Sequence, residues 1–161
     1  MPRVDDYLGA LALAREKLAA ESFELISARS GFEPADGSAL RVPFLDRVYR
    51  VSSTGFAFVD LAAAGRDVPL QEQILILHYL MARSPAAIAG DWVAYREIPG
   101  AAFYFGAFVK RAIDPLKKVF GRNVAGLVAA AGRLTGRPVA PGDAGFEFRV
   151  FPKVTLRLIL S

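Results

Sequence analysis

The stretch from Leu77 to Gly121 decides most of the fold. It contains LHYLMAR at 77–83, GDWVAYREIPG at 90–100 and FYFGAFVKRAIDPLKKVFG at 103–121. It holds the only histidine and the only tryptophan of the chain, an Arg-Glu dipeptide before Ile-Pro-Gly, and four of the twelve phenylalanines. We therefore expect any functional site to lie in this stretch.

The third part of the stretch predicts an amphipathic helix after Gly100. Apolar residues recur there at helical spacing, namely Phe105, Phe108, Val109, Ala112, Ile113, Leu116 and Phe120. Lys110, Arg111, Lys117 and Lys118 cluster on the other side. Asp114-Pro115 predicts a kink or a restart, and Gly121 is placed to end the helix.

The middle part, Asp91 to Ile98, predicts an extended segment. Pro99 disfavours a helical Ile98, and Trp92, Val93 and Tyr95 favour strands. Because side chains alternate along a strand, Arg96 and Glu97 should then point to opposite faces and have different partners.

The first part belongs to a predicted helix after Pro69 in which Leu70, Ile74, Leu77, His78 and Met81 share one stripe. Outward from this stretch, the periodicity predicts helices over residues 5–20, over 22–28 and after the capping residue Asn123 up to Gly136. A turn over 33–38 precedes predicted strands at 40–44, 47–52 and 56–61, and two more strands, 145–151 and 153–160, flank Pro152. We predict one α+β domain over residues 1–161, an antiparallel sheet with about four to five packed helices.

Residue types exclude several kinds of chemistry. The chain has no cysteine, which rules out disulfides, thiolate nucleophiles and cysteine-ligated clusters, and a single histidine cannot make a two-histidine metal site. We therefore expect no metal site and no cofactor. A Ser-His-Asp relay would need His78, which lies in an apolar run typical of a packed helix.

Hydropathy and the N-terminus predict the compartment. The longest apolar runs, 74–82 and 101–109, are shorter than the roughly 20 residues of a membrane-spanning helix. Asp5 and Asp6 stand where a signal peptide needs apolar residues. These features predict a cytoplasmic protein without a membrane segment.

Charge is unevenly distributed. Residues 110–137 carry seven basic side chains against only Asp114, a local excess of +6, while the rest of the chain sums to −2 because the total is +4. Such a segment either binds an anionic ligand, nucleic acid or acidic protein, or is an ordinary solvated helix face. The candidate anion-binding residues are Lys110, Arg111, Lys117, Lys118 and Arg122, completed by Tyr104, which lies on nearly the same side of the helix as Arg111.

The polar and aromatic residues of the stretch form a candidate pocket, consisting of His78, Trp92, Arg96, Glu97 and Tyr104. In the structural interpretation, which the pattern favours, His78 and Trp92 are core residues and Arg96 and Glu97 anchor the Pro-Gly turn. In the functional interpretation, Arg96 holds a carboxylate or phosphate and Glu97 acts as acid or base.

The stretch resembles a bacterial and archaeal family of uncharacterised domains that are sometimes fused to a four-iron cluster domain of the corrinoid iron-sulfur protein type. The resemblance covers about residues 20–160 and is clearest at 77–121. It implies a context in anaerobic corrinoid, one-carbon or metal-cofactor metabolism, with no catalytic residues to assign. This chain departs from the family in having no cysteines for a cluster, and in stopping at Ser161 where such proteins continue through an acidic segment, which leaves open a truncation at this end.

Three functions follow from these observations. An accessory or interaction domain ranks first and a small-molecule binder or enzyme using the candidate pocket ranks second. Nucleic-acid binding through the 110–137 basic face ranks third, because no reading motif accompanies it. The apolar strand ending at Leu160 further predicts either an interior position in the sheet or a free edge that is closed. A protein partner, a second copy or residues outside this sequence would close this edge, with Arg157 facing solvent or a partner carboxylate.

Overall fold

The computed structural model describes residues 4–83 and 90–161 of the chain. They form helices and two antiparallel sheets, which confirms the α+β class. The chain divides into two compact units, one of residues 1–87 and 149–155 and the other of residues 88–148 and 156–161. Each unit is described by itself below, and the single domain over 1–161 stays a prediction.

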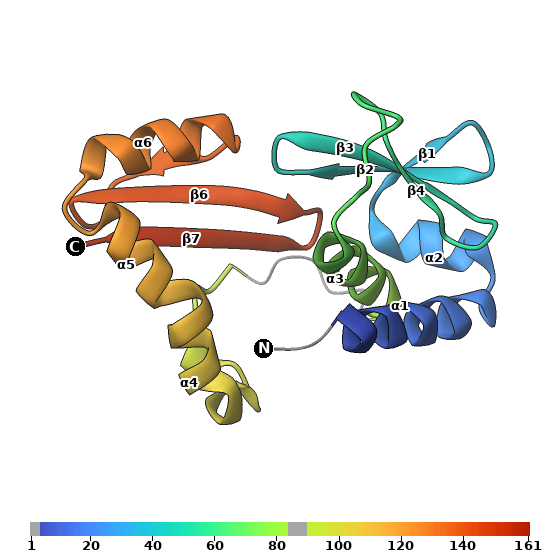
Figure 1. The fold of residues 1–161 in the computed structure, drawn as a ribbon, viewed down its shortest axis with the longest axis horizontal. Coiled ribbons are helices and arrows are strands. Elements are labelled where there is room, and N and C mark those ends of the chain that lie inside the picture. The colour runs from blue at the N-terminus through green and yellow to red at the C-terminus, as the bar shows by residue number, and fades with distance from the viewer. Residues whose placement is uncertain (1–3, 84–89) are drawn as a thin grey trace. The chain divides into compact units, whose positions relative to one another are not determined.

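The first unit combines three helices with a four-stranded sheet (Figure 1). Its elements are α1 (Val4–Ala19), α2 (Phe23–Ser30), β1 (Glu33–Ala35), β2 (Ala39–Phe44), β3 (Arg47–Ser52), β4 (Phe58–Asp60) and α3 (Leu70–Met81). The strands run in the order β1-β2-β3-β4, each antiparallel to the next. This confirms the predicted meander.

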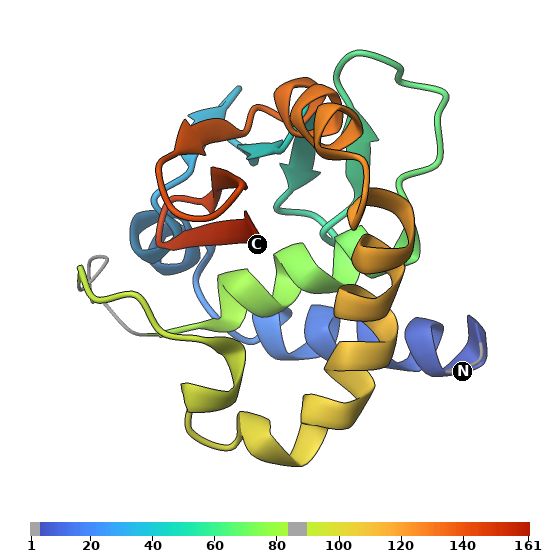
Figure 2. The ribbon, with the colours of Figure 1, turned by 90° about the vertical axis from the view of Figure 1, so that its left-hand side faces the viewer.

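The core of the first unit lies between its helices and its sheet. It contains the buried side chains Leu11, Leu18, Ile26, Leu40, Val42, Tyr49, Val51, Ile76, Leu77, Leu80 and Phe151. Helices α1 and α3 lie side by side within it (Figure 2). Burial of a large apolar side chain of this kind stabilises the fold by about 1.5–3 kcal/mol relative to leaving it exposed.

Strand β1 was predicted as a turn. Glu33, Pro34 and Ala35 pair with Arg41, Leu40 and Ala39 around a short connection that contains Asp36 and Gly37. Asp36 and Gly37 have positive φ, 41° and 76°, which is common in tight hairpin connections. Pro34 is tolerated because β1 is an edge strand, where the missing N–H breaks no ladder.

The second unit contains a helical segment built of several short helices, a longer helix and most of a three-stranded sheet. Its elements are the 3-10 turns η1 (Tyr95–Glu97) and η2 (Ala101–Tyr104), α4 (Phe105–Phe108), a π turn (Val109–Ile113), α5 (Asp114–Phe120), α6 (Val124–Arg133), β5 (Arg137–Val139), β6 (Ala144–Phe151) and β7 (Val154–Leu160). The strand order is β5-β6-β7. Residues 149–155, at the turn between β6 and β7, belong to the first unit.

The helical segment from Phe105 to Phe120 is continuous, with helical backbone angles at each junction. Pro115 offers no N–H and would crowd the carbonyl of Arg111 in a regular α-helix. The π turn immediately before α5 widens the helix at this place. Asp114-Pro115, where a kink or a restart was predicted, thus follows a π turn, and the helix continues through it.

Strand β7 is the last strand in the order of its sheet among the described residues. An interior position, one of the two predicted alternatives, is therefore wrong for the part of the chain that the structure describes. Closure of its free edge by a partner stays a prediction.

Candidate functional site

His78 is exposed, and no described residue forms a hydrogen bond to its ring. The predicted burial of His78 is wrong, because α3 buries Ile76, Leu77 and Leu80, and of the expected stripe only Leu77 is among them. At 100° per residue, His78 lies about 200° from Ile76 and thus on the far side of the helix. His78 belongs to the first unit and the other four candidate pocket residues to the second, so their grouping stays a prediction.

Arg96 and Glu97 lie in the 3-10 turn η1, so the predicted strand over 91–98 is wrong. The Glu97 carboxylate accepts a hydrogen bond from the Ala94 N–H at 2.5 Å. Such local side chain–backbone bonds favour a turn over an extended chain. The two residues do have different partners, as predicted, because the Arg96 guanidinium lies 6.0 Å from the centroid of the Phe105 ring.

Trp92 is exposed and lies against the sheet of the second unit instead of in a core. The Arg157 guanidinium stacks over its ring, 4.1 Å from the centroid. Arg157 Nε also donates to a Glu147 carboxylate oxygen at 3.1 Å, and Arg137 on β5 donates to the other oxygen at 3.1 Å. Arg157 thus pairs with a carboxylate of its own chain, which removes it from the predicted interface with a partner.

The row Arg137–Glu147–Arg157–Trp92 crosses all three strands. Partial burial raises the pKa of Glu147, but hydrogen bonds from Arg157 and Arg137 lower it more, so this pKa lies below the ordinary value of 4.5. The carboxylate stays ionised and fixes both arginines. This row is a structural ladder on a sheet face rather than a free anion site.

The predicted basic face is exposed as expected. Lys110, Arg111, Lys117, Lys118 and Arg122 are all exposed. Arg111 donates a hydrogen bond to the Tyr104 hydroxyl and lies 5.6 Å from the centroid of that ring, so the predicted placement on one side is confirmed. Within residues 4–83 and 90–161, no carboxylate pairs with the other four cations.

An unpredicted cluster of charged side chains surrounds Asp60 in the first unit. Its fully buried carboxylate binds Arg66 at 3.0 Å and Arg47 at 3.2 Å and accepts the Ala62 N–H at 2.9 Å. Burial raises the pKa of Asp60, but the Ala62 N–H and the two arginines lower it more, so it lies below the ordinary value of 3.8. The cluster fixes the turn after β4.

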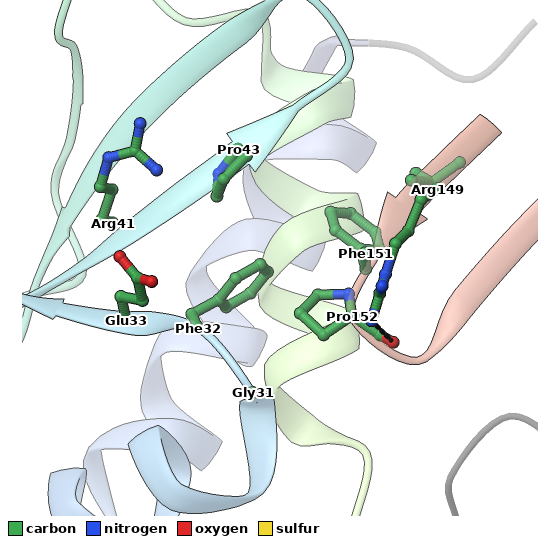
Figure 3. Close-up of a pocket in the computed structure, with 9 residues that line it drawn as sticks. Gly31, Phe32, Glu33, Arg41, Pro43, Arg149, Phe151 and Pro152 are labelled. Carbon is green, nitrogen blue, oxygen red and sulfur yellow. Dashed lines mark hydrogen bonds between the residues drawn. The ribbon is translucent and has the colours of Figure 1, made fainter. Parts of the chain in front are cut away.

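An unpredicted cavity also lies in the first unit (Figure 3). It has a volume of about 260 Å³ and is lined by Gly31, Phe32, Glu33, Arg41, Pro43, Arg149, Val150, Phe151 and Pro152. Its two arginines are 108 positions apart in the chain. No local pattern in the sequence could therefore have predicted that these two arginines lie at the same cavity.

Among the described residues, no group of three or more His, Asp or Glu side chains is arranged to hold a metal ion. The longest apolar helices in the same residues are too short or too polar to cross a bilayer.

The fold and these surfaces define a small α+β protein with a basic helical surface and a compact cavity. A family model for a domain of unknown function, DUF3786, matches residues 22–161, and the chain belongs to this family. This confirms membership in a family of uncharacterised domains, whereas fusion to a cluster domain and the anaerobic context stay predictions. Comparison with curated proteins and with solved structures found no match.

Proposed function

We propose that this protein is an interaction domain that binds an acidic partner protein through the helical segment 101–120. The observation that carries the proposal is the exposure of this amphipathic segment. None of its residues is buried in η2, α4, the π turn or α5. By contrast, α1, α3 and α6 each bury several side chains.

Large apolar side chains of the segment face solvent. Phe103 is 97% exposed and Val119 is 59% exposed. Covering one such side chain on binding contributes about 1.5–3 kcal/mol, and aromatic residues are frequent energetic centres of interfaces. A partner that covers both would gain enough to offset part of the entropy of association.

The charges around these apolar residues select the partner. Lys110, Lys117, Lys118 and Arg122 lack carboxylate partners among the described residues, so an acidic surface would complement them. A second copy of the chain would place the same cations against one another. An acidic protein segment that also carries apolar residues therefore fits this surface best.

Photo-crosslinking tests the proposal. The full chain carries benzoylphenylalanine in place of Phe103 and is irradiated in cells, and the crosslinked peptide is identified. We expect a peptide that combines Asp or Glu with apolar residues. Binding of that partner should weaken about tenfold or more in Phe103→Ser and in Lys117→Glu/Lys118→Glu, and should fall as salt rises.

Two control variants match these changes on the first unit, namely Leu25→Ser at a side chain that is 64% exposed and Lys17→Glu on α1. Both should bind as the unaltered chain does. Equal binding by all variants, or crosslinks that never involve position 103, would contradict the proposal.

Nucleic-acid binding is the second candidate, because the unpaired cations of this surface would equally attract phosphates. A salt-sensitive gel shift with random duplex DNA that disappears in Lys117→Glu/Lys118→Glu would favour it. Small-molecule binding or catalysis through His78, Trp92, Arg96, Glu97 and Tyr104 remains a prediction. So does a role in anaerobic corrinoid metabolism, which the identity of the crosslinked partner would test.

A further inference from the structure

The cavity of the first unit combines an apolar floor with a charged rim. Phe32 and Phe151 form the floor, both buried and packed edge to face with centroids 6.1 Å apart. Pro43 and Pro152 form the walls. Such a floor accepts a flat apolar group. The volume of the cavity lies below the usual range of about 300–1,000 Å³ for sites that bind drug-sized ligands, so only a small ligand fits.

The arginines of the rim differ from most described arginines of this unit. Arg29, Arg47, Arg50, Arg66 and Arg83 each form an ion pair with a carboxylate, and Arg15 donates hydrogen bonds to the Phe56 carbonyl and the Gln73 side chain. Arg149 donates one hydrogen bond to the Pro152 carbonyl at 3.2 Å, and no described residue binds Arg41. Both guanidinium groups therefore keep donors available for a ligand.

The third charged residue of the rim sets the charge of the ligand. Figure 3 shows Glu33 beside Arg41 at one end of the cavity and Arg149 at the other end. Glu33 pairs in strand register with Arg41 but forms no ion pair with it. Two cations and one anion leave the rim with a net charge of +1, which suits a monoanion better than a dianion.

Beside the floor, Gly31 lies in close contact with the Pro152 ring, at a position that favours glycine. Gly31 has φ 75°, and a Cβ at this position would lie 2.9 Å from Cβ of Pro152. The connection after α2 and the turn after β6 therefore pack directly on each other. Gly31 and Pro152 thus fix the two connections that line this side of the cavity.

We propose that this cavity binds a small organic monocarboxylate with a flat apolar body, its carboxylate held by Arg149 and its body lying on Phe32 between Pro43 and Pro152. Guanidinium groups bind carboxylates through paired hydrogen bonds, and the Arg149 end has no competing acid. This site lies on the first unit and does not depend on the proposed interaction surface of the second unit.

Nuclear magnetic resonance titration of the isotope-labelled full chain tests this inference, with sodium benzoate as the probe. Benzoate should cause saturable shifts at the Arg149 side chain and at the amides of Gly31, Phe32 and Val150. Benzamide has the same shape without the charge and should bind about tenfold more weakly or worse. Phenyl phosphate should also bind more weakly than benzoate, because Glu33 repels a dianion.

Substitutions separate this cavity from general surface binding. Arg149→Gln should weaken benzoate about tenfold or more, Arg41→Gln should weaken it less, and Glu33→Gln should tighten it. Lys17→Gln, at an exposed lysine of α1, should change nothing, and unperturbed spectra of each free variant verify its fold. Equal binding of benzoate and benzamide, tighter binding of phenyl phosphate, or an Arg149→Gln variant that binds normally would overturn the proposal.

Discussion

Single residues decide where this fold tolerates charge. Asp60 has no exposed surface, yet it stays ionised because two arginines and a backbone N–H compensate its burial. The sequence predicted none of this, since Arg47, Asp60 and Arg66 come together only when β3 and β4 pair. It also favoured a core position for His78, whose ring is exposed.

The lowered pKa of Asp60 makes stability depend on pH. A carboxyl whose folded pKa lies below its unfolded value stabilises the fold above the unfolded value, and this contribution is lost as pH falls through the folded pKa. The loss should therefore occur below about pH 4, given the ordinary value of 3.8. We expect Asp60→Asn to be less stable than the unaltered chain at neutral pH and to lose less stability on acidification.

Chemical denaturation from about pH 7 down to about pH 2 measures this difference. Asp46→Asn, at an exposed aspartate of the same unit, is the matched control. Parallel curves of stability against pH for Asp60→Asn and the unaltered chain would contradict the lowered pKa of Asp60 in the folded protein.

At the scale of elements, the predicted and observed helices agree within a few residues for α1, α2, α3 and α6. Their apolar periodicity is a local property of the sequence, so it predicts these helices without any knowledge of how they pack. The short strands β1 and β5 were missed because three residues that contain a proline carry no alternation, and only the neighbouring strand defines them. The prediction of an extended segment over 91–98 was wrong for a related reason, since a local side chain–backbone bond accompanies the turn there.

The cap of α6 gives a prediction at this scale. The Asn123 side chain accepts a hydrogen bond from the Gly126 N–H at 2.9 Å, as the sequence predicted. Asn123→Ala should reduce the free energy of unfolding by about 1 kcal/mol. Ser22 stands at the same position before α2 but makes no capping bond with its side chain.

Ser22→Ala is thus the matched control and should change stability by less than about 0.5 kcal/mol. Urea denaturation of both variants provides the comparison. Equal effects at the two positions would show that the bond to Gly126 does not stabilise α6.

For the molecule as a whole, the free edge of β7 is the feature that bears on assembly. Strand β7 ends its sheet among the described residues and exposes Leu156 and Ile159. An apolar edge of this kind offers unpaired backbone groups to another chain. We therefore propose that the free edge pairs with a second copy, while Arg157 stays engaged with Glu147 in its own chain.

Light scattering of the full chain over a range of concentrations tests this pairing. The apparent mass should rise toward that of a dimer, and Ile159→Lys should keep the chain monomeric, because edge lysines oppose strand pairing. Val128→Lys on α6, at a side chain that is 48% exposed, is the control and should associate normally. A chain that remains monomeric at every concentration would refute the proposal.

The sequence by itself determined the α+β class, the helical periodicity, the central meander, the Asn123 cap and the exposed basic face of the 105–120 helix. These features depend on residues within about two turns or one hairpin of each other, where spacing and turn chemistry suffice. Tertiary structure alone decided the exposure of His78, the pairing of Arg157 with Glu147, the burial of Asp60 and the cavity between Arg41 and Arg149. Each of these depends on which elements pack or pair together, a choice that the local pattern of one element does not contain.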